Sequence, residues 1–63
     1  MDDKCRYELL RVIGALQDAY AYVRHTEELS EDRGDLARIV MLRKQIMNSI
    51  DHASILYETL RRP

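Results

Sequence analysis

The stretch Ser30-Glu31-Asp32-Arg33-Gly34-Asp35, near the middle of the chain, decides how the sequence folds. Glycine readily adopts the left-handed conformation that ends many helices, and aspartate is a preferred N-cap residue. We therefore expect Gly34 to end one helix and Asp35 to cap the next. The stretch predicts a hairpin turn over about residues 31–35.

The residues before this turn have the period of an amphipathic helix. Apolar side chains recur at intervals of three and four residues, so they share one face of a helix with 3.6 residues per turn. This pattern predicts a helix over about residues 4–30. Its apolar face collects Cys5, Leu9, Val12, Ile13, Leu16, Ala19, Tyr20 and Val23.

The residues after the turn repeat the pattern and predict a second helix over about residues 36–61. In a heptad description, one seam position holds Ile39, Ile46, Ala53 and Leu60, and the other holds Leu42, Ser49 and Leu56, flanked by Ile50 and Tyr57. The only proline ends the chain, so none interrupts either helix. The fold class is therefore all-α, an antiparallel two-helix hairpin, with residues 1–63 as a single domain.

The charges are balanced and spread along the chain. Ten basic and eleven acidic residues give a net charge of −1, which disfavours nucleic acid as a partner. Charges three or four residues apart, such as Arg24 with Glu27 and Glu28, are expected to pair on the helix surface. The N-terminal residues lack the pattern of a secretory signal, and no apolar run approaches ~18 residues. We expect no membrane segment and a cytoplasmic location.

Few groups in the sequence have the residue types of catalytic or metal sites. His25 with Glu28 and His52 beside Asp51 lack the inward-facing Glu-x-x-His pairs of metal sites in helical bundles. Cys5 falls on the apolar face, where a cysteine usually packs as a small hydrophobic residue. We therefore expect no enzyme, no metal site and no cofactor.

A chain of 63 residues lies near the lower limit for a stable domain. Its single cysteine excludes an intrachain disulfide, so self-association is the expected source of further stability. We expect a homodimer that forms a four-helix bundle. The predicted core and oligomer interface consists of Leu9, Val12, Ile13, Leu16, Tyr20, Val23, Ile39, Leu42, Ile46, Ile50, Ala53, Tyr57 and Leu60.

Four further apolar residues project away from the predicted seam between the helices. They are Tyr22, Leu29, Met41 and Ile55. Because such side chains would face water in a lone hairpin, they are the candidate surface for a protein partner. Scattered exposed apolar residues are also common on soluble proteins, so this interpretation stays open beside harmless exposure.

In its two matched amphipathic helices, the chain resembles short helical hairpins that dimerise into four-helix bundles, such as the plasmid-copy-number RNA-binding repressor. It also resembles the small helical-hairpin co-chaperones of type III secretion. Both resemblances concern architecture, since the chain carries no residue motif of the repressor family. They imply a protein–protein interaction module of regulatory, adaptor or co-chaperone type or, as the alternative, an RNA-binding helical hairpin.

Overall fold

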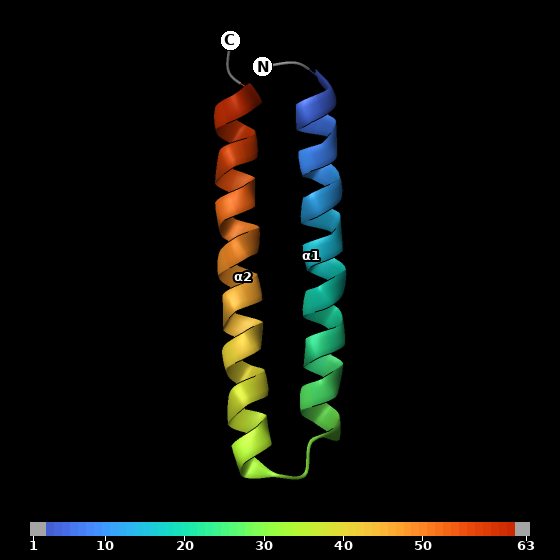
Figure 1. The fold of residues 1–63 in the computed structure, drawn as a ribbon, viewed down its shortest axis with the longest axis vertical. Coiled ribbons are helices and arrows are strands. Elements are labelled where there is room, and N and C mark those ends of the chain that lie inside the picture. Colours follow the sequence, from blue (N-terminus) through green and yellow to red (C-terminus); the bar gives the residue numbers. More distant parts are fainter. Residues whose placement is uncertain (1–2, 62–63) are drawn as a thin grey trace.

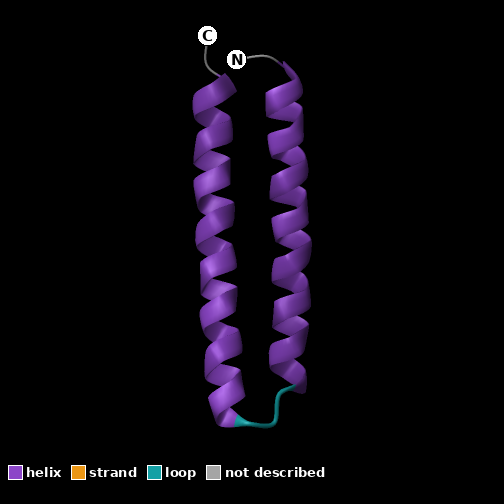
Figure 2. Cartoon of the chain, in the orientation of Figure 1, coloured by secondary structure: helices purple, strands orange, loops and turns teal. Residues whose placement is uncertain are grey.

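The computed structural model describes residues 3–61 and contains two long helices. Helix α1 spans Asp3–Leu29 and helix α2 spans Arg33–Arg61, with residues 30–32 between them. The helices run side by side in opposite directions, so the start of α1 and the end of α2 lie at the same end of the molecule (Figure 1). The short connection at the other end is the loop between them (Figure 2). The predicted all-α antiparallel hairpin is confirmed.

The turn is shorter than predicted, and a different residue caps the second helix. The backbone N–H of Asp35 donates to Asp32 Oδ1 at 2.9 Å, and the N–H of Leu36 donates to the Asp32 carbonyl at 2.9 Å. These two bonds make Asp32, not Asp35, the N-cap of α2. Gly34 consequently lies in the first turn of α2, and no glycine in the described residues has a positive φ.

The loop preserves part of the α1 hydrogen-bond pattern, which explains why it needs no left-handed residue. The N–H of Ser30 donates to the carbonyl of Glu27 at 3.2 Å and closes a tight last turn. The Ser30 hydroxyl then donates to the Asp32 carbonyl at 3.3 Å. Three residues and these bonds are enough to reverse the chain.

The hairpin is long and thin. Its extents are 49 × 14 × 10 Å and its radius of gyration is 14.7 Å, whereas a compact chain of this length has a radius of about 11 Å. Two packed helices contact each other along one line, so each side chain at the contact keeps one side open to water. No residue within positions 3–61 is fully buried.

Two rows of partly buried positions along each helix form the contact, which we call the seam. The positions are separated alternately by three and four residues, the spacing of a coiled-coil interface. In α1 the seam consists of Arg6, Leu9, Ile13, Leu16, Tyr20, Val23 and Glu27, and in α2 of Leu36, Ile39, Arg43, Ile46, Ile50, Ala53, Tyr57 and Leu60.

The second row of the seam in α2 is shifted by one position along the sequence from the predicted row. The partly buried row is Leu36, Arg43, Ile50 and Tyr57, whereas the predicted Leu42, Ser49 and Leu56 are exposed. The row that packs contains the larger side chains. It brings Arg43 into the seam, where polar groups of α1 accommodate it.

Three residues expected on the apolar face of the first helix, Cys5, Val12 and Ala19, lie outside the seam, and Ala19 is partly buried beside it. Val12 is about half exposed, and Cys5 is exposed rather than packed. Among the residues predicted for the core or an oligomer interface, Val12 and Leu42 thus remain open, and all the others lie in the seam. The apolar stripe of each helix is wider than one neighbouring helix can cover.

Replacing Asp32 tests the observed cap. We expect Asp32→Ala to lower the free energy of unfolding by about 1 kcal/mol, because the Asp35 N–H in the first turn of α2 loses its side-chain acceptor. Asp32→Asn, which retains a capping oxygen, should change it much less. Urea denaturation measures both values. A larger loss for Asp35→Ala than for Asp32→Ala would instead support the cap expected from the sequence.

Candidate functional site

One ion pair crosses the seam. Arg43 Nε of α2 donates to Glu27 Oε1 of α1 at 2.5 Å, and the two side chains are only 29 % and 18 % exposed. Hydrogen bonding to Glu27, and secondarily to Tyr20, raises the pKa of Arg43 above its ordinary value. The pair with Glu27 thus favours the charged form of Arg43, the form that arginine already prefers.

This pair replaces the local pairing expected for Glu27. The sequence suggested Arg24 as a partner for Glu27, yet the Glu27 carboxylate turns across the seam to Arg43. Of the ion pairs formed by the described residues, the others join positions three apart on one helix. Tyr20 and Glu27 lie seven residues apart in the seam of α1, which is two helical turns. Because Arg43 interacts with both side chains, the contact favours one register of α2 along α1.

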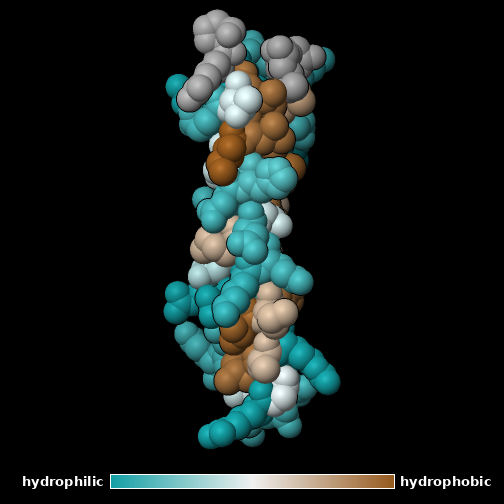
Figure 3. All heavy atoms as spheres, turned by 90° about the vertical axis from the view of Figure 1, so that its left-hand side faces the viewer, coloured by the Kyte–Doolittle hydropathy of each residue, from teal (hydrophilic) through white to brown (hydrophobic). Residues whose placement is uncertain are grey.

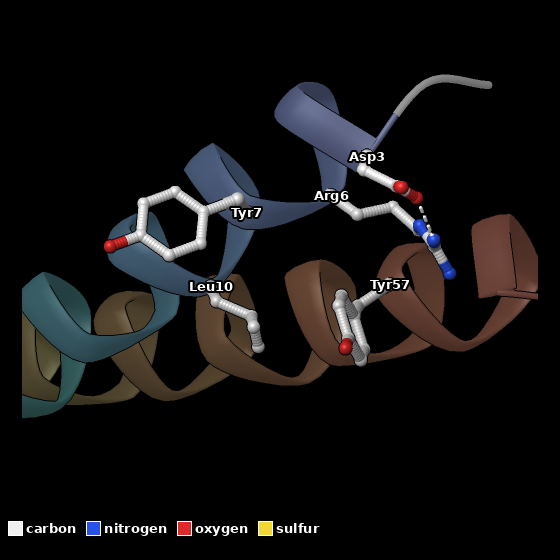
Figure 4. A pocket seen from close by; sticks show the side chains of 5 residues that line it. All are labelled: Asp3, Arg6, Tyr7, Leu10 and Tyr57. Carbon is white, nitrogen blue, oxygen red and sulfur yellow. Dashed lines mark hydrogen bonds and ion pairs between the residues drawn. The ribbon is translucent and has the colours of Figure 1, made fainter.

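A shallow hollow of about 280 Å³ lies near the ends of the chain, bordered by Asp3, Arg6, Tyr7, Leu10 and Tyr57. Figure 4 shows Arg6 extending toward Asp3, with which it forms an ion pair, while Tyr7 points in another direction. The Asp3 carboxylate already engages the guanidinium. The hollow is also smaller than most small-molecule pockets, so it offers little to a charged or drug-sized ligand.

The histidines lie on the solvent-facing surface. His25 Nδ1 is 3.9 Å from Glu28 Oε2 with both side chains largely exposed, and His52 is exposed as well. Within residues 3–61, no cluster of three or more His, Cys, Asp or Glu side chains has the arrangement to hold a metal ion. The described surface can offer contact area to another molecule.

The exposed apolar residues sort onto the two sides of the seam. In an antiparallel pair of helices, the positions directly before the seam residues share one side. We name this side the Leu42 flank. It consists of Cys5, Glu8, Val12, Ala15, Ala19, Tyr22, Thr26 and Leu29 from α1, and of Asp35, Arg38, Leu42, Gln45, Ser49, His52, Leu56 and Thr59 from α2.

The opposite side, the Leu10 flank, contains many more charges. Its apolar members are chiefly Tyr7, Leu10, Val40 and Met47. Its charged members are Asp3, Arg24, Glu28, Arg33, Lys44, Asp51, Glu58 and Arg61. On the Leu42 flank only Glu8, Asp35 and Arg38 are charged, and all three lie toward the ends of the hairpin. The two sides of one hairpin therefore differ strongly in polarity.

The outer face of α2, which points away from α1, carries two separate apolar areas. Figure 3 views the molecule from the α2 side and shows apolar surface near both ends, with hydrophilic surface between. Met41 toward the turn and Ile55 toward the chain end are 60 % and 67 % exposed. The intervening Lys44, Asn48 and Asp51 are polar and exposed.

The four predicted partner-surface residues do not form one patch. All four are more than half exposed, but Tyr22 and Leu29 belong to the Leu42 flank, while Met41 and Ile55 occupy the outer face of α2. The structure thus separates two candidate surfaces that the sequence grouped together.

Compared with protein-family models, with curated proteins and with solved structures, the chain matches none. Within the described residues, neither α1 nor α2 contains an apolar stretch of the length and low charge needed to cross a membrane.

Sequence reasoning missed the contact between Glu27, Arg43 and Tyr20. A signal for it exists in seven-residue spacing, because Arg43 interrupts an otherwise apolar row of α2 and Glu27 ends the row of α1 that contains Tyr20. Opposite charges at seam positions on the same end of a hairpin indicate an ion pair across the seam. A prediction from the spacing of apolar residues alone does not detect this ion pair.

We expect Glu27→Gln to lower the melting temperature by a few degrees, because it removes one charge from a pair that is largely shielded from water. Glu58→Gln is the matched control, since Glu58 pairs with Arg61 at 3.5 Å on the exposed surface. Its effect should be close to zero. Equal shifts for the two variants, measured by circular dichroism, would contradict a special role for the pair in the seam.

Proposed function

We propose that this chain is a small, non-enzymatic protein–protein interaction module that works as an oligomer. Its simplest form is a homodimer whose two hairpins make a four-helix bundle and present helix surface to a protein partner. A regulatory, adaptor or co-chaperone role suits such a module. The observation that carries the proposal is the surface of the lone hairpin, which leaves every described residue at least partly open to water.

The accessible surface area gives the size of the missing contact. A folded monomer of 7.5 kDa is expected to expose about 4,200 Å², whereas this chain exposes 5277 Å². The surplus is roughly 1,000 Å², and a standard protein–protein interface buries about 800 Å² on each partner. One interface of ordinary size per chain would therefore bring the exposed area to that of a compact protein.

The outer face of α2 supports the further step from oligomer to adaptor. Met41 and Ile55 are fourteen residues apart, which places them roughly 21 Å apart along one side of the helix. Both lie on the side of α2 opposite the seam, so packing along a flank leaves them accessible. Two apolar anchors separated by polar surface are typical of a site for a helical or extended segment of a partner.

If folding and association are coupled, the melting temperature rises with protein concentration. We expect an increase of several degrees over a hundredfold range of concentration, followed by circular dichroism. Sedimentation equilibrium on the same samples should give twice the chain mass. A stably folded monomer whose melting temperature does not change with concentration would refute the oligomer.

The outer face of α2 can be tested with the intact protein as bait. We expect the double variant Met41→Glu, Ile55→Glu to remain dimeric and helical, because both side chains lie away from the seam and its flanks. A protein captured from the native extract by the wild type and lost with this variant would support the proposed surface.

The paired double variant Lys44→Glu, Asn48→Glu alters the polar surface between Met41 and Ile55 and serves as control. Capture of the same protein by wild type and by Met41→Glu, Ile55→Glu would count against an apolar site on α2. Capture of RNA that is lost steeply with added salt would favour the RNA-binding alternative instead.

A further inference from the structure

We propose that the Leu42 flank is the surface on which a second copy of this chain docks. The inference rests on the proposed function, since it names the face through which the oligomer forms. Three properties of the flank support it, namely its charge, its hydroxyl groups and the order of its side-chain sizes.

The charges of the Leu42 flank are few and already neutralised within the chain. Arg38 Nη1 lies 3.8 Å from Asp35 Oδ1, and Glu8 Oε1 lies 3.3 Å from Arg11 Nη1. In a two-fold dimer the same patch meets itself, so a patch with a strong charge of one sign would repel its copy. A nearly neutral flank fits a second copy of itself better than a strongly charged partner. The Leu10 flank would bring many charges into such a contact.

The serine and threonine hydroxyl groups of the Leu42 flank turn inward to their own helices. Thr26 Oγ1 donates to the Tyr22 carbonyl at 2.9 Å, and Ser49 Oγ donates to the Gln45 carbonyl at 3.1 Å. Thr59 Oγ1 does the same with the Ile55 carbonyl at 2.9 Å. A hydroxyl whose proton is already bonded loses little when a partner excludes water. These polar residues therefore leave the flank suited to an apolar contact.

In the row nearest the seam, the side chains of the flank are small in the middle and larger on either side. The longer central residues Gln45 and His52 lie farther from the seam. Ala19 and Ser49 occupy the central region, whereas Val12 with Leu56 and Tyr22 with Leu42 lie on either side. A two-fold axis through the middle superposes small on small and large on large. Two such faces can approach closely at the centre while their larger residues pack toward the ends. The surplus area of roughly 1,000 Å² per chain matches one contact of this kind.

A pair of matched substitutions tests the face. Leu42 and Leu10 are the same residue type, are 48 % and 46 % exposed in the hairpin, and lie on opposite flanks. We expect Leu42→Glu to raise the dimer dissociation constant at least about a hundredfold, because each copy then places an unpaired carboxylate in the contact. Leu10→Glu should leave it within about threefold of the wild type. Sedimentation equilibrium measures all three proteins.

The outcomes separate this inference from the proposed function. A wild-type dimer that Leu10→Glu disrupts and Leu42→Glu does not would overturn the Leu42 flank but retain the oligomer. Equal disruption by the two substitutions would overturn it as well. A wild-type chain that is a folded monomer would refute the oligomer itself.

A second measurement keeps the test valid if Leu42→Glu fails to fold. In a Cys5→Ser background, single cysteines at Leu42→Cys and Leu10→Cys retain apolar side chains at both sites. At protein concentrations well above the dissociation constant, we expect alkylation at position 42 to be at least about tenfold slower than at position 10. The rates should become similar on dilution. Equal rates at high concentration, or slower alkylation at position 10, would overturn the inference.

Discussion

Two helices can touch each other only along a line, and this constraint governs every other feature of the hairpin. A third element would be needed to close around any side chain, so the seam residues remain partly open and the chain stays 49 Å long. A small domain gains its stability from the apolar area that it removes from water. This hairpin removes less than a compact fold of the same mass would, although its apolar stripes are broad enough to bury more. The shape and the composition of the chain are therefore both in keeping with the further packing that we propose.

Within that limit, part of the seam consists of polar contacts rather than apolar ones. Glu27 and Arg43 occupy positions where two apolar side chains would exclude more water. Buried or half-buried ion pairs seldom add much stability over an apolar pair, but they penalise arrangements that separate the two charges. Sliding α2 by one heptad would leave both charges partly desolvated without a partner. The seam gains a defined register at a place where apolar stripes alone would permit several.

The sequence predicted the two helices, their pairing and the position of the turn, because all three depend on local patterns. Apolar residues at three- and four-residue intervals and the absence of internal proline suffice for long helices. The N-cap was wrong by three residues, since Asp32 and Asp35 are both suitable caps and only the backbone geometry distinguishes them. The predicted second row of the α2 seam was displaced by one position for a related reason. Broad stripes fit more than one row, and the row that packs in the structure is the one that places Arg43 against Glu27 across the seam.

The separation of the two surfaces has a consequence for binding. The Leu42 flank lies beside the seam, whereas Met41 and Ile55 lie on the opposite side of α2, so occupation of one surface does not cover the other. In the proposed dimer the two outer faces of α2 would be displayed together on one rigid body. A partner with two matching segments would then bind the second site at a high effective concentration, which raises its overall affinity without any new contact. Because only the folded dimer carries the paired sites, such a partner would also stabilise the fold by mass action. Folding, self-association and partner binding would thus depend on one another, as the partly open seam of the lone hairpin leads one to expect.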